Sequence, residues 1–416
     1  MSGIRSYALV TAAYWAFTLS DGALRLLVLL HFHALGYTPV ELAFLFVLYE
    51  FFGVVTNLLG GWIAATTGLR STLLGGLALQ VVALGALSLL DPTWGRAVSV
   101  AYVTGVQALS GIAKDLTKMS SKSAIKALVP QDDSALFRWV ALLTGSKNAL
   151  KGAGFFLGGL LLSLFGFRYS LWGMAAGLVF ILLGALVQLP VAMGKAKGKA
   201  AFSTLLSKSR EINLLSAARF FLFGARDIWF VVGVPVFLSS QMGWTFTEVG
   251  SSLALWVIGY GFIQSCAPAL LGRFTGGRAP RGGAAQVLAF GLAAVMALIP
   301  LALLFTPLPP AAVVLGGLAA FGVVFALNSS VHSYLILAYS DGDKVALNVG
   351  FYYMANASGR LIGTLLSGVM YQMAGLPGCL WTSMAFALAS AVIALWLPRG
   401  GKEVALSQVK VEVGGD

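Results

Sequence analysis

Charged side chains are scarce in this chain. They make up 10% of its 416 residues, whereas hydrophobic residues make up 58%. An ordinary soluble domain has about 25% charged residues, and a soluble fold of this length would need a charged surface that the sequence lacks. The composition therefore excludes a soluble protein and predicts an integral membrane protein with apolar segments long enough to span a bilayer.

Cysteine is also rare, and nucleotide-binding and zinc-binding motifs are absent. Cys266 and Cys379 lie far apart in the sequence, which excludes a disulfide framework and a thiolate cluster for a soft metal. No Walker loop is present, so we expect no ATP drive, no cofactor, no metal and no nucleic-acid partner. No polar connection is long enough to hold a soluble catalytic domain, so we expect a protein that is not an enzyme.

Long apolar stretches are what the sequence has in abundance. A transmembrane helix needs roughly 20 mostly apolar residues, and twelve such stretches can be counted. The predicted spans are 7–31, 39–66, 71–90, 97–119, 137–165, 169–190, 213–239, 246–271, 284–306, 311–337, 345–373 and 378–398. The predicted fold class is therefore an all-α integral membrane protein with twelve transmembrane helices.

The basic residues between the spans predict the orientation in the membrane. Cytoplasmic connections of membrane proteins carry an excess of Lys and Arg. With both termini inside, seventeen basic residues fall on the cytoplasmic side, and only Arg96 and Arg168 fall outside. We therefore expect a multi-pass membrane protein with both termini in the cytoplasm.

The two halves of the chain look like copies of each other. Related features recur at an offset of about 207 residues: the capping-box pattern Thr-x-x-Glu at 38–41 and 245–248, a segment that begins with Asn-Ala and ends with a basic residue at 148–151 and 356–360, and an aspartate at 21 and 227. These repeats suggest a duplication. The predicted organisation is an N-terminal six-helix bundle at 1–190, a cytoplasmic linker at 191–212, a C-terminal six-helix bundle at 213–398 and a cytoplasmic tail at 399–416.

Charged residues inside the predicted spans are costly and unevenly distributed. Each Lys or Arg at the centre of a membrane helix costs about 2.5–3.5 kcal/mol on insertion scales. Eight basic residues lie within spans, Arg25, Lys114, Lys118, Lys147, Lys151, Arg219, Arg226 and Arg360, against four acids, Asp21, Glu50, Asp115 and Asp227. Several spans carry no charge, so we expect the others to line a water-filled or protein-lined interior.

This excess of positive charge predicts an anion site. Arg offers a planar fork for carboxylate or phosphate, and Lys offers a point charge. Asp21 is expected to pair with Arg25, and Asp227 with Arg219 or a partner helix, which leaves other cations for a small, multiply charged anion. The predicted substrate-binding residues are Arg25, Lys114, Lys147, Lys151, Arg226, Asn356 and Arg360. Lys118 is predicted on the access path.

Other roles for these groups stay open at this point. Structural ion pairs and snorkelling are the alternative, which we favour for Lys118 and Arg219 because they lie near span ends. Asp21, Glu50, Asp115, Asp227 and His332 are predicted to carry protons or to form ion pairs, since buried carboxylates and histidines can titrate near neutrality.

Two six-helix repeats joined by a long polar connection resemble the major facilitator superfamily. The resemblance covers the whole chain and implies two helical bundles around a central cavity that alternates in access. The family's loop motif between spans two and three, roughly G-x-L-x-D-R-x-G-R-R, is degenerate here, because segment 61–70 keeps the glycines and Arg70 but lacks the Asp. The sequence therefore does not support that loop's usual gating role.

Three segments resemble a narrower group, the ArsJ-type organoarsenical exporters of bacteria. They are YWAFTLSDGALR at 14–25, SGIAKDLTKMS at 110–120 and TGSKNALKG at 144–152. This resemblance implies export of 1-arseno-3-phosphoglycerate, which glyceraldehyde-3-phosphate dehydrogenase makes from arsenate, and hence arsenate resistance. It also implies a place in the bacterial inner (plasma) membrane and a functional link to that dehydrogenase, and we expect a monomeric transport unit.

Two other functions remain as alternatives. One is an exchanger or proton-coupled transporter of another organophosphate or carboxylate anion with the same fold. The more distant one is a membrane enzyme or sensor, which would need a catalytic constellation or a signalling domain that the sequence does not display.

Overall fold

The chain is all-helical wherever its structure is described. The computed structural model describes residues 3–67, 69–128, 133–190, 209–275, 280–339 and 345–398. The helices are α1 Gly3–Ala34, α2 Pro39–Phe44, α3 Val47–Thr67, α4 Leu69–Ser88, α5 Arg96–Leu128, α6 Asp133–Gln188, α7 Arg210–Phe230, α8 Gly233–Val236, a π-helical turn Phe237–Gln241, α9 Phe246–Thr275, α10 Gly282–Phe305, α11 Pro310–Ala338 and α12 Val345–Ala394.

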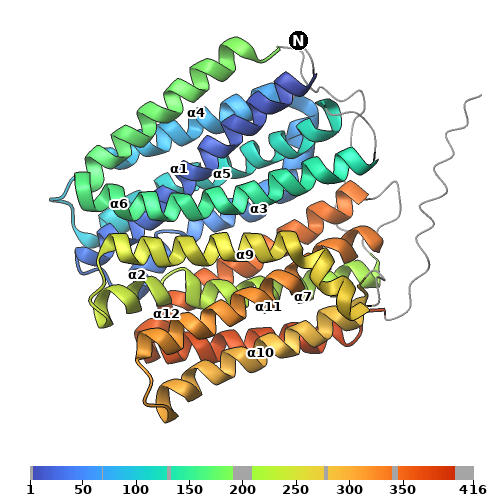
Figure 1. The fold of residues 1–416 in the computed structure, drawn as a ribbon. Helices are drawn as coiled ribbons and strands as arrows, with labels where there is room; N and C mark the ends of the chain where they lie inside the picture. Colours follow the sequence, from blue (N-terminus) through green and yellow to red (C-terminus); the bar gives the residue numbers. More distant parts are fainter. Residues whose placement is uncertain are drawn as a thin grey trace, which may run out of the picture.

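Two of these helices each contain a break that makes two membrane crossings. A straight helix of 56 residues, the length of α6, would be about 84 Å long, far more than the ≈30 Å hydrocarbon core of a bilayer. Gly166 breaks α6 with a φ of 70°, and Figure 1 shows the chain turning back there. Gly375 breaks α12 with a φ of 61°. Glycine suits both positions because it alone adopts positive φ without steric cost.

The number of crossings agrees with the sequence prediction. Nine described segments are long and apolar enough to cross a membrane, and they include the two that contain breaks. Helix α5 is not among the nine, because its second half carries Lys114, Asp115 and Lys118. It nevertheless packs along α3 and α4 as a full member of the bundle. With α5, and with two crossings each for α6 and α12, the described residues contain the twelve crossings expected.

The helices form two groups that lie side by side (Figure 1). In the first group α1 packs on α6, α3 and α4 pack on α5, and α4 also packs on α6. In the second group α12 packs on α7 and α10, and α11 packs on α9 and α10. The groups meet where α6 contacts α9 and where α3 contacts α12. The predicted linker and tail are mostly outside the described residues, so the predicted domain boundaries stay a prediction.

Glycines allow the closest of these helix contacts. A Cβ added to Gly22 of α1 would lie 2.8 Å from the carbonyl oxygen of Lys151 on α6, and one added to Gly154 would lie 2.5 Å from the carbonyl oxygen of Leu19. Neither position has room for a larger residue. Small residues therefore bring the α1 and α6 backbones together, as they do in many membrane helix pairs.

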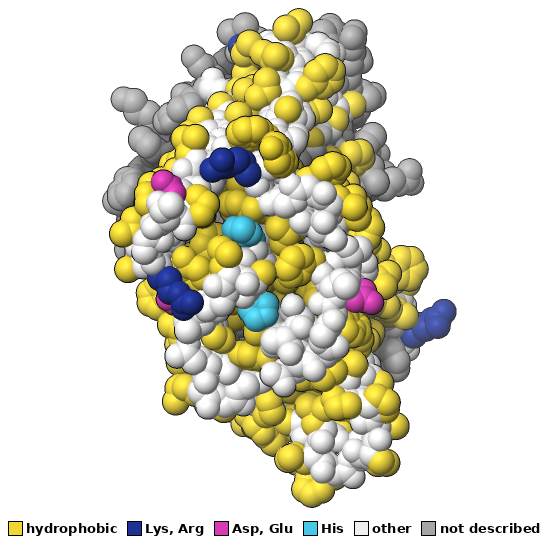
Figure 2. All heavy atoms as spheres, turned by 90° about the vertical axis from the view of Figure 1, so that its left-hand side faces the viewer, with side chains coloured by type: hydrophobic (Ala, Val, Ile, Leu, Met, Phe, Trp, Pro, Cys, Tyr) yellow, Lys and Arg dark blue, Asp and Glu magenta, His cyan; other side chains and the backbone are white. Residues whose placement is uncertain are grey.

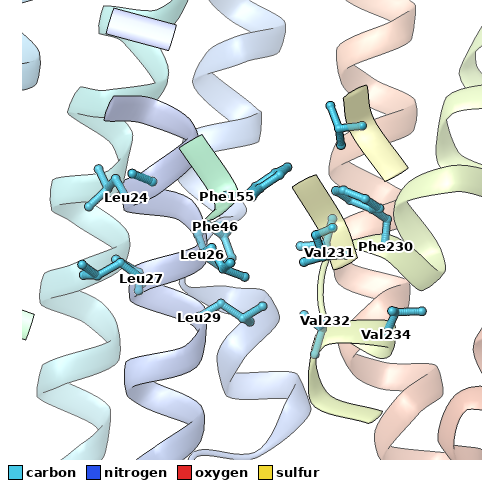
Figure 3. Close-up of a cluster of buried hydrophobic side chains, with 14 of the residues drawn as sticks. Leu24, Leu26, Leu27, Leu29, Phe46, Phe155, Phe230, Val231, Val232 and Val234 are labelled. Atoms are coloured by element: carbon cyan, nitrogen blue, oxygen red, sulfur yellow. The ribbon is translucent and has the colours of Figure 1, made fainter. Parts of the chain in front are cut away.

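An apolar closure seals the interface between the groups at one end, defined here as Leu26, Leu29, Phe46 and Phe155 facing Phe230 and Val231. Figure 3 shows these side chains from the two groups opposite one another. The rings of Phe155 and Phe230 lie 5.7 Å apart. A small gap of about 20 Å³ remains among these residues, with Arg25 at its border.

The closure lies toward the end of the molecule that holds the short connections 35–38, 89–95, 242–245 and 306–309, called here the loop end. Figure 2 shows this end, where hydrophobic and neutral groups dominate and few charged side chains are seen. Arg96 lies over the ring of Tyr37 at 5.3 Å, and Asp91 accepts hydrogen bonds from Thr93 that lower the pKa of its carboxyl. The scarcity of basic residues here fits an external face, and the sidedness stays a prediction.

Candidate functional site: a charged cavity between the two helix groups

A cavity with a volume of about 200 Å³ lies between the two helix groups. It is bordered by residues 14–21 of α1, by later turns of α3 and α5, and by α6, α7, α9, α11 and α12. Because α1 reaches the loop end only at Ala34, this position places the cavity toward the opposite end of the molecule. The apolar closure separates it from the loop end.

Most of the predicted site residues meet in this cavity. Seven basic side chains line it, Lys114, Lys118, Lys147, Lys151, Arg219, Arg226 and Arg360, together with the acids Asp21 and Asp115 and the predicted Asn356. Arg25 is the one predicted substrate-binding residue outside the lining. It lies deeper, beside the apolar closure, and is 8% exposed.

Five charged residues form a continuous set of ion pairs at the deep end of the cavity. The members of this arginine network are Arg25, Glu50, Arg360, Asp227 and Arg226. The Oε1 atom of Glu50 accepts hydrogen bonds from Arg25 at 2.7 Å and from Arg360 at 2.6 Å. Asp227 accepts from Arg360 at 3.1 Å and from Arg226 at 2.5 Å. The network carries a formal charge of +1 and joins α1 and α3 to α7 and α12.

The acids of this network are fully enclosed. Glu50 is 0% exposed and Asp227 is 1% exposed. Removing one member of a buried ion pair costs about 3–5 kcal/mol, because the remaining charge is left without compensation. The network therefore requires all its members in this conformation.

The expected Asp21–Arg25 pairing is wrong, whereas Asp227 has a partner on another helix, Arg360 of α12, which is one of the two pairings expected for it. Asp21 accepts hydrogen bonds from the hydroxyl of Tyr49 at 2.8 and 2.9 Å, whereas Arg25 binds Glu50. The neighbouring helix α3 supplies a partner for each, and these contacts replace the one-turn pairing along α1. Asp227 binds Arg226 and Arg360 and not Arg219.

A second acid–base cluster involves Asp115 and Lys118, predicted on the access path. Lys118 donates to Asp115 at 2.7 Å and to the amide oxygen of Asn57 at 2.5 Å. Thr56 and Asn57 donate to the same carboxylate at 3.0 and 3.3 Å. Lys118 thus lines the cavity while forming an ion pair, so it has both of the features that the sequence left as alternatives.

Lys114 and Lys151 contact aromatic rings. The ammonium nitrogen of Lys114 lies 4.0 Å from the ring centre of Tyr49, and that of Lys151 lies 5.5 Å from the ring of Phe155. Within the described ranges, neither ammonium has a carboxylate within 4.0 Å. Both ammonium groups are therefore placed at the cavity wall by aromatic rings, and neither forms a direct ion pair with a described carboxylate.

Arg219 belongs to the site, although its position near a span end favoured a structural role in the sequence prediction. It lines the cavity, is 4% exposed, and donates to Asn356 at 3.0 Å and to the hydroxyl of Ser329 at 3.1 Å. Gln264 and Asn148 continue this polar belt, since Asn148 donates to Gln264 at 3.0 Å across the two helix groups. A signal was present in the sequence, because Arg219 lies seven residues before Arg226 and hence on the same face of α7.

His332, predicted as a proton carrier, lies outside the cavity. It is 0% exposed, and neither ring nitrogen has a hydrogen-bond partner among the described residues. Nor does any group of His, Cys, Asp and Glu in the described ranges have an arrangement that could hold a metal ion.

Comparisons with known proteins agree with this architecture. A sequence model described as "Major Facilitator Superfamily" matches residues 10–330. A solved structure described as the crystal structure of a D-xylose-proton symporter superimposes with a TM-score of 0.70. The alignment covers 94% of this chain and 97% of that one at 14% identity, so the likeness concerns the fold alone. No curated protein matches the chain.

Proposed function

The chain belongs to the major facilitator superfamily and is therefore a secondary transporter, and we propose that its substrate is a small organic anion with more than one negative charge. The observation that carries this proposal is the cavity lining, with seven basic side chains against two acidic ones. Including the buried Arg25, Glu50 and Asp227 gives eight against four, so a formal excess of four positive charges remains. A bound anion would compensate charges that are otherwise costly inside a membrane.

Alternating access is the mechanism that this arrangement supports. The cavity lies toward the end where α1 begins, and the apolar closure and the arginine network separate it from the loop end. A substrate that enters past Lys118 and binds in the cavity would be released once the two helix groups rock apart at the loop end. The predicted positive-inside orientation makes this an export route.

The proposed substrate is 1-arseno-3-phosphoglycerate, with arsenate resistance as the outcome. Segments 14–25, 110–120 and 144–152, which carry the resemblance to organoarsenical exporters, supply Asp21, Lys114, Lys147 and Lys151 of the cavity wall. An arsenate group and a phosphate group on a three-carbon body match a cavity with cations on both helix groups. Glyceraldehyde-3-phosphate dehydrogenase would supply this substrate in the same cell, as a functional partner.

Another organophosphate or a dicarboxylate is the second candidate, exchanged or coupled to protons. Asp21 favours proton coupling, because it lines the cavity and, within the described ranges, forms no ion pair. An inside-negative membrane potential by itself favours anion exit by about 2.3 kcal/mol per charge per 100 mV. Transport that ignores an imposed pH gradient at fixed voltage would exclude the proton model and favour uniport.

Reconstituted vesicles test the substrate directly. The purified protein is inserted into vesicles, 1-arseno-3-phosphoglycerate is generated enzymatically on one side, and arsenate released on the other side is measured. Protein-dependent arsenate release supports the proposed substrate. Transport of glycerol 3-phosphate without arsenate release would favour the second candidate, and transport of neither would contradict the proposed anion transporter.

A further inference from the structure

Seven of the eight basic residues of the site fall into two classes by their partners. Arg25, Arg226 and Arg360 are bound to buried carboxylates of the arginine network, and Lys118 is bound to Asp115. Lys114, Lys151 and Arg219 have no carboxylate within 4.0 Å among the described residues, although all three line the cavity. The two classes differ in what an incoming anion would gain from them.

We infer that Lys114, Lys151 and Arg219 bind the anionic groups of the substrate, while the arginine network holds the loop end closed. This inference rests on the proposed anion transport and assigns its site residue by residue. It moves the binding role away from Arg25, Arg226 and Arg360. An anion at those arginines would have to compete with a carboxylate already within 3.1 Å, whereas an anion at the other three would displace no described carboxylate from a direct ion pair.

Arg219 is held in position by neutral groups only. Its Nε donates to Asn356, one terminal nitrogen donates to Ser329, and the guanidinium lies 3.9 Å from the ring centre of Phe223. Its second terminal nitrogen donates to no described residue. These contacts fix the orientation of the guanidinium without neutralising it, which is the arrangement that charge-assisted binding of a carboxylate or phosphate requires.

Lys114 and Lys151 occupy the opposite wall. Lys114 is on α5 and Lys151 is on α6, whereas Arg219 is on α7 of the other helix group. Tyr49 and Phe155 hold the two ammonium groups through ring contacts and leave their hydrogen-bond donors available. A substrate with separate anionic groups at its two ends can therefore contact both helix groups at once. The inferred class is a short organic molecule with two oxyanion groups.

This division of roles links binding to movement. A molecule with a single anionic group would satisfy one wall only, whereas a molecule with two such groups would draw the two helix groups together around the cavity. That closure strains the opposite end of the interface, where Arg360 and Glu50 join the groups. We infer that substrates with two anionic groups are selected by this requirement.

Binding measurements on the full-length protein separate the two classes. The probes are 3-phosphoglycerate, which has a phosphate and a carboxylate, and glycerol 3-phosphate, which has only the phosphate. The variants are Arg219→Gln, Lys114→Gln and Lys151→Gln, with Arg226→Gln as the network variant. Arg168→Gln is the matched control, because Arg168 is an exposed cation far from the cavity lining. Isothermal titration in detergent gives the affinities.

We expect Arg219→Gln to weaken 3-phosphoglycerate binding about ten- to hundredfold, the loss typical of a charge-assisted hydrogen bond. Its affinity for glycerol 3-phosphate should fall much less, so that the preference for two anionic groups disappears. Arg219→Lys should restore part of the affinity because it keeps the charge. Arg168→Gln should change the affinity for both probes by less than about threefold.

Three other outcomes would each contradict a different part of the inference. Normal 3-phosphoglycerate binding in Arg219→Gln, with loss in Arg226→Gln, would overturn the assignment and return the binding role to the arginine network. Equal binding of both probes by the unmodified protein would overturn the requirement for two anionic groups. Binding of neither probe by the unmodified, folded protein would contradict the proposed function itself, and the inference would fall with it.

Discussion

Arg360 of α12 and Glu50 of α3 are 310 residues apart in sequence, yet their side chains lie 2.6 Å from each other. This ion pair crosses from one helix group to the other, beside the apolar closure. Because Glu50 also binds Arg25, one carboxylate holds together three helices from both groups. Any conformation that opens the loop end has to separate Arg360 from Glu50.

Replacing Glu50 should therefore open the loop end. Glu50→Gln leaves Arg25 and Arg360 without their shared carboxylate, and the loss of a buried ion-pair partner costs about 3–5 kcal/mol. We expect a lower thermal unfolding temperature and faster labelling of Leu29→Cys by a membrane-impermeant maleimide, in a protein lacking Cys266 and Cys379. Glu41→Gln is the control, since the ion pair that it removes, with Arg96 at 3.9 Å, is at the protein surface. Unchanged labelling would mean that the network does not hold this end closed.

The cations of the site should be needed for transport whichever role each one has. Arg25→Ala, Lys147→Ala and Arg360→Ala are each expected to reduce export at least about tenfold, since each removes a buried charge–charge or charge–substrate interaction worth 1.5–3 kcal/mol or more. Membrane insertion, checked by protease protection, should stay intact. Normal transport by all three variants would show that the cavity is not the transport site.

Close packing of α1 on α6 should be sensitive to size. Gly22→Val places atoms against the Lys151 carbonyl oxygen, where even a Cβ would lie 2.8 Å away, so α1 and α6 must move apart. Overpacking of this kind costs about 1–3 kcal/mol. A cell-based expression and melting assay should show a loss for Gly22→Val and none for Gly173→Val, because Gly173 has open space around it. Equal behaviour of the two variants would contradict the packing described here.

A charged residue placed in the apolar closure should make the loop end permeable. Val231→Asp introduces a carboxylate at a residue that is 7% exposed and faces the opposite helix group. Because an unpaired buried charge is highly unfavourable, we expect the loop end to admit water. Vesicles with this variant should leak small anions down a gradient, whereas Val98→Asp, at a 56% exposed position, should not leak. A tight Val231→Asp variant would argue against a single apolar barrier.

The glycine spacing shows how far the sequence alone could go. Gly154/Gly158 and Gly173/Gly177 have the same small-xxx-small pattern. In the structure the first pair meets the backbone of α1, and the second pair has nothing within 4 Å of an added Cβ. The spacing identifies a face that can pack closely, but it does not say whether another helix lies against that face.

For the charged residues, too, the sequence predicts which side chains are buried but not which partners they bind. Composition and span position identified most of the charged residues of the cavity, because burial of a charge is costly wherever the partner lies. They did not identify the partners. Asp21 and Arg25 are one turn apart on α1, yet each is bound by a residue of α3, Tyr49 and Glu50. Interhelical geometry decides such pairings, and local spacing carries no information about it.

The arginine network also has a consequence for biosynthesis. Glu50 has Arg25 as a partner within the first helix group, and Asp227 has both Arg226 and Arg360 within the second. Because domains fold largely as units while the chain is made from its N-terminus, each group can neutralise its own acid before it meets the other. Only the Glu50–Arg360 contact has to wait for the second group. The newly inserted first half therefore enters the lipid without an isolated acid at position 50, long before residue 360 has been translated.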